Sequence, residues 1–186
     1  MEKTSYPITV AGVKRDLPLC RLSDDLQIAA FVIFGDVELT VHAAKKLLEK
    51  MPPVDYLIAP EAKAIPLVYE MSRQSGIPYI IARKKAKAYM TGVLEVTVQS
   101  ITTAGAQTLI LDTAEGEAMK GKRIGIVDDV ISTGESLRAV EALVNEAGGL
   151  VEARMAVLAE GDAAARKDII VLAPLPLFRP DGTPLL

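Results

Sequence analysis

Two adjacent carboxylates and a hydroxyl-rich loop form the part of this chain whose residue types and spacing could do chemistry. Asp128 and Asp129 end an apolar run, and Thr133, Gly134 and Ser136 follow directly before residues with helical spacing. Backbone N–H groups at the start of a helix, together with hydroxyl donors, bind a phosphate dianion. Carboxylates repel phosphate, but they accept hydrogen bonds from a vicinal diol and attract metal ions. The pattern therefore predicts a ligand that is a sugar carrying a phosphate.

The whole segment, residues 127–136, resembles the phosphoribosyl-diphosphate signature of the type I phosphoribosyltransferases. That signature has apolar residues, an acidic pair, two apolar positions, and then a small residue, Thr, Gly, any residue and Ser or Thr. The resemblance implies that the two acids are catalytic. It also implies that the substrate is bound by Val130, Ile131, Ser132, Thr133, Gly134, Glu135 and Ser136. A simple metal site, as in receiver domains and haloacid hydrolases, is the alternative interpretation, although those folds do not require this hydroxyl loop.

The composition indicates a globular protein and excludes several classes of function. The chain has 186 residues, of which 50% are hydrophobic, and a net charge of −3, so we expect one domain over 1–186. An acidic chain with no Trp and three Phe does not suit binding to nucleic acid. Cys20 is the single cysteine, and no apolar run is long enough for a membrane span or signal segment. These features predict a cytoplasmic protein that does not bind membranes.

The elements that must hold these residues alternate between strand and helix. Apolar runs predict strands at 54–59, 78–82, 123–127 and 151–158, and helical spacing covers 37–50, 64–75 and 136–147. This succession predicts an α/β fold with a doubly wound, mainly parallel sheet covered on both faces. Alternating apolar residues within 91–111 predict a separate β-hairpin. We expect a core over about 36–160 and a small hood from about 1–35 and 161–186.

Two basic segments follow other predicted strands, and a parallel sheet brings such loops to one edge. Ala62 and Lys63 lie in a segment that resembles the family's pyrophosphate loop, with Lys63 where adenine-type members usually have Arg. Arg83, Lys84 and Lys87 lie in a basic run that resembles the segment before the mobile catalytic loop of adenine phosphoribosyltransferases. The resemblance implies catalytic roles for Lys63 and Arg83, and substrate binding by Ala62, Lys84 and Lys87. Solvated surface charge is the alternative interpretation of both segments.

These residues suit the displacement of diphosphate from the anomeric carbon of phosphoribosyl diphosphate. Positive charge builds on the sugar and negative charge on the leaving group, so fixed carboxylates and fixed cations both stabilise the transition state. We expect Asp128 and Asp129 to hold the ribose hydroxyls, and the basic side chains with Mg²⁺ to hold the diphosphate. The ion is expected to bind mainly through the substrate, with the same two acids as the protein groups nearest to it. His42 is expected on a helix surface, and a loop over about 84–107 is expected to close during turnover.

The base is the part of the substrate that the residues constrain least. Ser132 stands where hypoxanthine-guanine enzymes typically have Asp, and Glu160 and Asp162 lie where oxopurine enzymes tend to place Lys. An ionised carboxylate accepts a hydrogen bond from an exocyclic amine but donates none to a carbonyl, which favours adenine and a role in purine salvage. Apolar segments at 31–34 and 174–178 are candidates for stacking on a purine. The alternatives are xanthine or another 6-oxopurine as the base, or a non-catalytic regulator that binds phosphoribosyl diphosphate.

Assembly is predicted from the basic run and the hairpin. In the family, the hairpin near this run packs against a second subunit, and an exposed pair of apolar strands is otherwise prone to aggregate. We therefore expect a homodimer in which Arg83 or Lys84 completes the diphosphate site of the neighbouring subunit.

Overall fold

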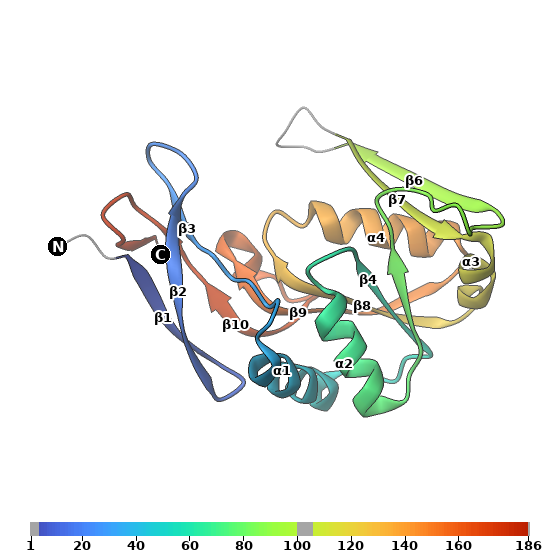
Figure 1. Ribbon diagram of the computed structural model, residues 1–186, viewed down its shortest axis with the longest axis horizontal. Helices are drawn as coiled ribbons and strands as arrows, with labels where there is room; N and C mark the ends of the chain where they lie inside the picture. Colours follow the sequence, from blue (N-terminus) through green and yellow to red (C-terminus); the bar gives the residue numbers. More distant parts are fainter. Residues whose placement is uncertain (1–3, 100–105, 186) are drawn as a thin grey trace.

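A parallel sheet lies at the centre of the computed structural model, which describes residues 4–99 and 106–185 (Figure 1). The strand order is β10-β9-β8-β4-β5, and each neighbouring pair is parallel. The strands are β4 (Tyr56–Pro60), β5 (Tyr79–Ala82), β8 (Arg123–Ile131), β9 (Leu150–Glu160) and β10 (Ile170–Leu175). Because all five run the same way, the loops that leave their carboxyl ends lie along one edge of the sheet.

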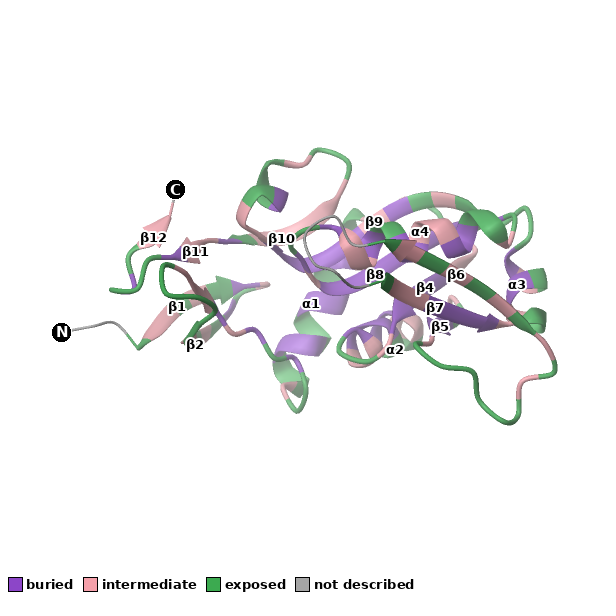
Figure 2. Cartoon of the chain, turned by 90° about the horizontal axis from the view of Figure 1, so that it is seen from above, coloured by how far each residue is buried: buried purple, intermediate pink, exposed green. Residues whose placement is uncertain are grey.

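Helices cover both faces of this sheet. α1 (Val37–Lys50) and α2 (Ile65–Ser75) pack together on one face, and α4 (Glu135–Glu146) packs on the other. The buried side chains accordingly form two clusters, one containing Leu47 and the other containing Val140. Figure 2 shows the central strands buried between the helices. Burial of each such side chain stabilises the fold by about 1.5–3 kcal/mol.

A β-hairpin covers the outer side of α4. β6 (Val93–Gln99) and β7 (Ala106–Asp112) are antiparallel, and both strands contact α4. The short helix α3 (Thr113–Met119) follows, and Asp112 and Glu115 form a capping box at its start. The hairpin is therefore packed against the core of the protein through one of its faces.

Both ends of the chain contribute to a second five-stranded sheet, the hood, at the left in Figure 1. Its order is β1-β2-β3-β11-β12, and β11 joins the two ends by pairing with β3. The strands are β1 (Ser5–Val10), β2 (Val13–Arg21), β3 (Gln27–Ala29), β11 (Leu177–Phe178) and β12 (Pro184–Leu185). The rings of Tyr6 and Phe178 pack edge to face with their centroids 5.0 Å apart. A 3₁₀ helix, η1 (Gly161–Ala165), leads from β9 toward β10.

The α/β architecture, the hairpin and the hood from both termini confirm the predicted fold, and three details differ from the prediction. β8 continues to Ile131 because it remains paired with β9 as far as Ala159, so Asp128 and Asp129 lie inside a strand and not after it. β10 pairs with β9, so the main sheet extends beyond the predicted core boundary at 160. α3 was not predicted. Across the described residues, no helix combines the length and apolar composition needed to cross a bilayer.

Candidate active site

Four loops leave the carboxyl ends of adjacent strands and lie in a row along one edge of the sheet. They follow β9, β8, β4 and β5 in that spatial order. The loops span residues 161–168, 132–134, 61–64 and 83–89. Three of them carry the residues that the sequence predicts for the site, so the strand order explains how distant parts of the chain come together.

Asp128 and Asp129 are buried in the last part of β8, with exposed fractions of 7% and 5%. Consecutive residues of a strand face opposite sides of a sheet, so the two carboxylates have different surroundings. The Asp129 N–H donates a hydrogen bond to Asp128 Oδ1 at 2.9 Å. The two carboxylates also lie within side-chain hydrogen-bonding range of each other, so the acids form one pair inside the strand.

The pKa of Asp128 is raised to about 7, chiefly by burial and then by the negative charge of Asp129. Hydrogen bonds from the Asp129 backbone and the Ser136 hydroxyl favour the ionised form and partly oppose this rise in pKa. A carboxyl group with this pKa gains a proton or loses it near neutral pH. A cation or a positively charged sugar placed beside it favours the ionised form.

Asp129 faces Lys63, which lies in the loop after the neighbouring strand. Asp129 Oδ2 is 3.8 Å from Lys63 Nζ, which makes an ion pair but is too long for a hydrogen bond. Within residues 4–99 and 106–185, the buried side-chain atoms without a hydrogen-bond partner are this oxygen and Arg83 Nε. Leaving such a group unsatisfied costs about 1–3 kcal/mol, a cost that a ligand hydroxyl would remove. The Lys63 side chain is 59% exposed, so its ammonium group is accessible to an anion.

The loop predicted to bind phosphate has a suitable geometry. Gly134 has a φ of 78° and is the N-cap residue of α4. A left-handed φ at this position suits glycine, which has no side chain to cover the first N–H groups of the helix. Thr133 Oγ1 accepts a hydrogen bond from the Glu135 N–H at 3.4 Å, and the Arg138 N–H donates to the Gly134 carbonyl at 2.9 Å. The loop and the helix start therefore present donors for an anion.

The first residue of the basic segment after β5 is tied to β7. The backbone of Arg83 exchanges two hydrogen bonds with Ile110 of β7, at 2.9 and 2.7 Å. Its guanidinium carbon lies 5.7 Å from the ring centroid of Tyr89, within cation–π range. Lys84 and Lys87 are exposed to solvent. In the described part of the chain, Lys63 forms an ion pair with Asp129. The other predicted cations, Arg83, Lys84 and Lys87, form no ion pair with Asp128 or Asp129 there.

Several predicted site residues are less available to a ligand. Ile131 is 2% exposed and its side chain packs in the cluster around α4, so only its backbone could contact a substrate. Val130 is half-buried against the other cluster. Ala62 is exposed beside Lys63, and the peptide bond between Glu61 and Ala62 is cis. The predicted closing loop at 84–107 includes residues 100–105, which lie outside the described residues. His42 is exposed on α1, as predicted.

Residues 132–134, the loop predicted to bind phosphate, are called the phosphate loop below. Arg166 lies beside this loop, and the sequence analysis did not identify it. Its Nη1 atom lies 2.9 Å from the point where a β-carbon on Gly134 would be. The available signal was its place after the carboxyl end of β9, the same criterion that indicates Lys63 and Arg83.

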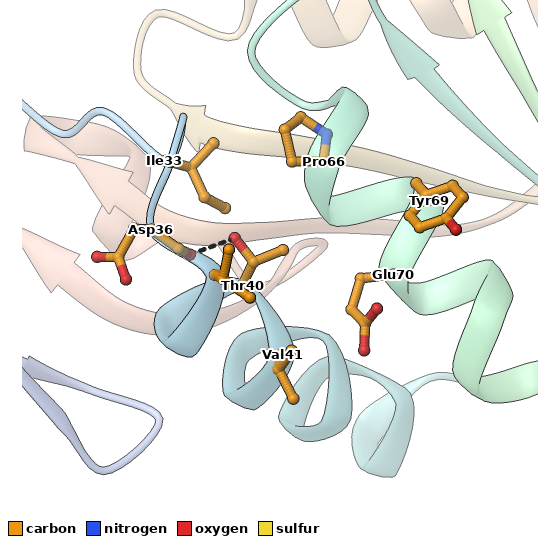
Figure 3. A pocket seen from close by; sticks show the side chains of 9 residues that line it. Ile33, Asp36, Thr40, Val41, Pro66, Tyr69 and Glu70 are labelled. Atoms are coloured by element: carbon orange, nitrogen blue, oxygen red, sulfur yellow. Dashed lines mark hydrogen bonds between the residues drawn. The ribbon is translucent and has the colours of Figure 1, made fainter.

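A separate apolar hollow of about 220 Å³ lies between α1 and α2 (Figure 3). Thr40 and Val41 line it from α1, and Pro66, Tyr69 and Glu70 line it from α2. None of the predicted catalytic or substrate-binding residues contributes to this hollow, although Ile33, from the segment predicted to stack on a purine, lines it. It is therefore distinct from the row of loops.

Comparison with known proteins identifies the family of this chain. A family model described as "Phosphoribosyl transferase domain" matches residues 39–172, which include the acids, the phosphate loop and both basic segments. The chain belongs to the phosphoribosyltransferase family. This confirms the resemblance that the sequence motif indicated.

Related phosphoribosyltransferases carry different names. The orotate phosphoribosyltransferase of Methanopyrus kandleri is 35% identical over 112 residues, which are 60% of this chain and 50% of the relative. The hypoxanthine/guanine phosphoribosyltransferase of Methanohalobium evestigatum is 32% identical over 130 residues, 69% of this chain and 65% of the relative. This phosphoribosyltransferase chain thus spans between half and two thirds of the length of these relatives.

Solved structures of adenine phosphoribosyltransferases share the fold. The enzyme of Thermoanaerobacter pseudethanolicus has a TM-score of 0.66 at 20% identity, with 92% of this chain and 95% of that chain covered. The Saccharomyces cerevisiae enzyme, solved with adenine and an imino-altritol bisphosphate, has a TM-score of 0.62 at 17% identity, with 91% and 93% covered. These similarities confirm the type I phosphoribosyltransferase fold, including the hood.

Proposed function

We propose that this phosphoribosyltransferase transfers 5-phosphoribose from phosphoribosyl diphosphate to a purine base and releases diphosphate. The observation that carries the proposal is the buried Asp129 Oδ2 atom, which has no hydrogen-bond partner and lies 3.8 Å from Lys63 Nζ, on the strand leading to the phosphate loop. The order of the groups along the sheet edge matches the order of groups in the substrate. The phosphate loop suits the 5-phosphate, the acids suit the ribose hydroxyls, and the loops at 61–64 and 83–89 suit the diphosphate.

The residues of the chain have distinct roles in this reaction. The bond between the anomeric carbon and the diphosphate oxygen breaks while a nitrogen of the base bonds to the same carbon, and the ring N–H proton of the base passes to the solvent. Asp128 and Asp129 stabilise the positive charge that develops on the sugar ring. Lys63 and Arg83 stabilise the negative charge on the departing diphosphate, with Lys84 and Lys87 adding positive potential around it.

Mg²⁺ is the cofactor that the donor groups fit. The described residues contain no cluster of three or more His, Cys, Asp or Glu side chains able to hold a metal. Asp128 and Asp129 remain as oxygen donors, which suits an ion that keeps several waters and binds mainly through substrate phosphates. When bound, the ion neutralises charge on the diphosphate. Lys63 would position the diphosphate beside the ion, and Asp128 and Asp129 would position the ribose hydroxyls.

The base is proposed to lie where the hood meets the core. A hollow of about 510 Å³ at this junction is lined by Tyr6 of β1, Asp162 of η1 and Leu177 of β11. Asp162 is an acceptor suited to the exocyclic amine of adenine. The second candidate is a 6-oxopurine, because the sequence relatives include hypoxanthine/guanine phosphoribosyltransferases.

A panel of bases tests this proposal. The purified protein is mixed with phosphoribosyl diphosphate, Mg²⁺ and one base at a time, and diphosphate release is measured. We expect the highest kcat/KM with adenine, and weaker release with hypoxanthine, guanine, xanthine and orotate. Preference for another base would contradict the assignment of adenine alone. Tight binding of phosphoribosyl diphosphate without release for any base would favour a regulator.

We also propose a homodimer in the cytoplasm, with a different interface from the one first expected. The hairpin packs on α4, and its Ile110 is bridged to Arg83, the residue after β5, so part of its edge is already covered. Large exposed apolar side chains also lie around the hollow between α1 and α2, where Val37 is 72% exposed and Tyr69 is 54% exposed. This surface is suited to a second copy of the chain.

A further inference from the structure

The position of Arg166 relates the segment after β9 to the phosphate loop after β8. Gly134 is buried, and a β-carbon added to it would lie 2.9 Å from Arg166 Nη1, closer than atoms of a real side chain approach. The guanidinium group therefore lies directly against the Cα atom of the loop. No side chain other than glycine fits at position 134 while Arg166 holds this position.

Asp168 fixes the orientation of this guanidinium group. Its carboxylate accepts hydrogen bonds from Arg166 Nε at 3.0 Å and from Nη2 at 2.6 Å. Two parallel bonds of this kind hold the plane of the group, and they leave the Nη1 side turned to the loop. The Arg166 side chain is 32% exposed, so this pair is partly shielded from water.

Two further charges connect the pair to α4 and β9. Glu141 of α4 forms an ion pair with Arg154 of β9. The negative charge of Glu141 helps to raise the pKa of Arg166, and the positive charge of Arg154 helps to lower the pKa of Asp168. Both effects favour the charged forms of Arg166 and Asp168. Alternating charges on α4, β9 and the segment at 166–168 therefore hold Arg166 relative to the same helix whose N-terminus forms the phosphate loop.

We propose that Arg166 determines the preference of this site for a doubly charged 5-phosphate, an inference that rests on the proposed function. Backbone N–H groups at a helix start already favour negative charge, and guanidinium donors beside them form charge-assisted hydrogen bonds that strengthen with the charge of the phosphate, even where a carboxylate such as Asp168 offsets part of the guanidinium charge. The second pKa of a phosphate monoester is about 6, so this preference acts in the physiological range. Arg166 thus selects for the phosphorylated sugar, while Lys63 acts on the diphosphate.

Calorimetric titration of three ligands with Mg²⁺ present tests the inference: phosphoribosyl diphosphate, ribose 5-phosphate and inorganic diphosphate. Arg166→Gln is expected to weaken binding of the first two about 10- to 100-fold and to leave diphosphate within about twofold. Arg166→Lys keeps the charge but loses the paired bonds to Asp168, so it should give an intermediate loss. Arg138→Gln, which removes an exposed arginine of α4 next to the loop, is the matched control and should leave all three affinities within about twofold.

The pH dependence gives a second measurement that a purely structural role would not change. Ribose 5-phosphate should bind wild type more weakly at pH 5.5 than at pH 7.5, and Arg166→Gln should reduce that difference. Asp128 titrates in the same range in both proteins, so its contribution cancels in the comparison. Equal losses of affinity for ribose 5-phosphate and for diphosphate, or no loss of affinity, would overturn the role of Arg166. Arg166→Lys is measured alongside, so this result can be read even if Arg166→Gln is destabilised. If wild type neither binds phosphoribosyl diphosphate nor releases diphosphate with any base, the proposed function fails and the inference fails with it. An active wild type with an unaffected Arg166→Gln variant overturns the inference alone.

Discussion

Asp128 and Asp129 are adjacent in sequence but meet different partners. Asp128 interacts with Ser136 at the start of α4, whereas Asp129 faces Lys63 before α2. Burial and the charge of Asp129 raise the pKa of Asp128 to about 7, so this carboxyl group changes protonation state near physiological pH. The two acids therefore should not be interchangeable, even though both are proposed to act on the ribose.

Replacing each acid by asparagine keeps its shape and removes its charge. We expect Asp129→Asn to lower kcat by about 100-fold or more, because a group that stabilises transition-state charge is typically worth that much. Its thermal midpoint should change little, because Asp129 Oδ2 has no hydrogen bond to lose. Asp25→Asn, at an exposed acid of the hood, is the control and should be fully active. Normal turnover in the Asp128→Asn/Asp129→Asn double variant would exclude the assigned role.

The raised pKa of Asp128 makes stability depend on pH. The pKa rises from its ordinary value of 3.8 to about 7 in the folded protein, so the fold binds this proton more tightly than the unfolded chain does. The stability that results is fully present below pH 4 and is lost as the pH rises to 7. Relative to Asp128→Asn, wild type should lose on the order of 3 kcal/mol between pH 4 and pH 7, measured by urea unfolding in EDTA. A constant difference between the two proteins would show that Asp128 has an ordinary pKa.

Candidate site residues can be predicted from the sequence where residue type and local spacing are sufficient to indicate a role. The acids, Thr133 and Gly134 could be proposed as site residues because their spacing along one strand, loop and helix is local. The pKa of Asp128 could not be predicted, because it depends on burial between neighbouring strands. Arg166 was missed for a related reason, since its contact with Gly134 depends on β9 lying beside β8.

At the scale of elements, the phosphate loop depends on the backbone at the start of α4. Gly134 combines a left-handed φ with a side-chain neighbour at close range, whereas Gly121 has a φ of 68° and no atom within 4 Å of an added β-carbon. The two glycines separate the effect of backbone strain from the effect of a blocked site.

Gly134→Ala and Gly121→Ala should therefore lose similar stability but differ in binding. Alanine in the left-handed region costs roughly 1 kcal/mol at either position. Gly134→Ala should also weaken the affinity for phosphoribosyl diphosphate by at least about tenfold, because the new methyl group displaces Arg166 and turns the loop N–H groups. Gly121→Ala should bind normally. Equal affinities in titration calorimetry would mean that this loop does not bind the phosphate.

Most elements follow from the sequence because apolar spacing and glycine punctuation agree with the fold. The prediction of β8 ended too early because two aspartates interrupt its apolar run, although pairing with β9 continues past them. β10 was assigned to the hood because prolines at 174 and 176 obscured its strand pattern. α3 has too few residues to show helical periodicity, and its capping box was the signal available.

At the scale of the whole molecule, the exposed apolar surface indicates where a second subunit would bind. Val37 is the first residue of α1, so Val37→Glu introduces a charge where a helix tolerates it well. We expect this variant to sediment as a folded monomer, whereas wild type sediments as a dimer.

Two variants of similar chemistry make the comparison specific. Val93→Glu places the same charge on the exposed face of the hairpin, where Val93 is 48% exposed, and Leu22→Glu places it on the hood, where Leu22 is 63% exposed. Both should remain dimeric. If Val93→Glu alone dissociated the dimer, the interface would lie on the hairpin and not on the surface between α1 and α2. A monomeric wild type would rule out the dimer.

The joining of β3 to β11 has a consequence for how the protein is made. Gln27 pairs with Phe178 across the hood, and its side chain donates to the Pro180 carbonyl at 2.5 Å. During synthesis, the main sheet and the phosphate loop emerge from the ribosome before residues 177–185, which complete the hood. A nascent chain can therefore gather its anion-binding loops while the surface proposed for the base is still missing. Contacts this distant in sequence also form slowly. Competence for the proposed nucleobase should consequently appear later than the ability to bind phosphate in each newly translated molecule.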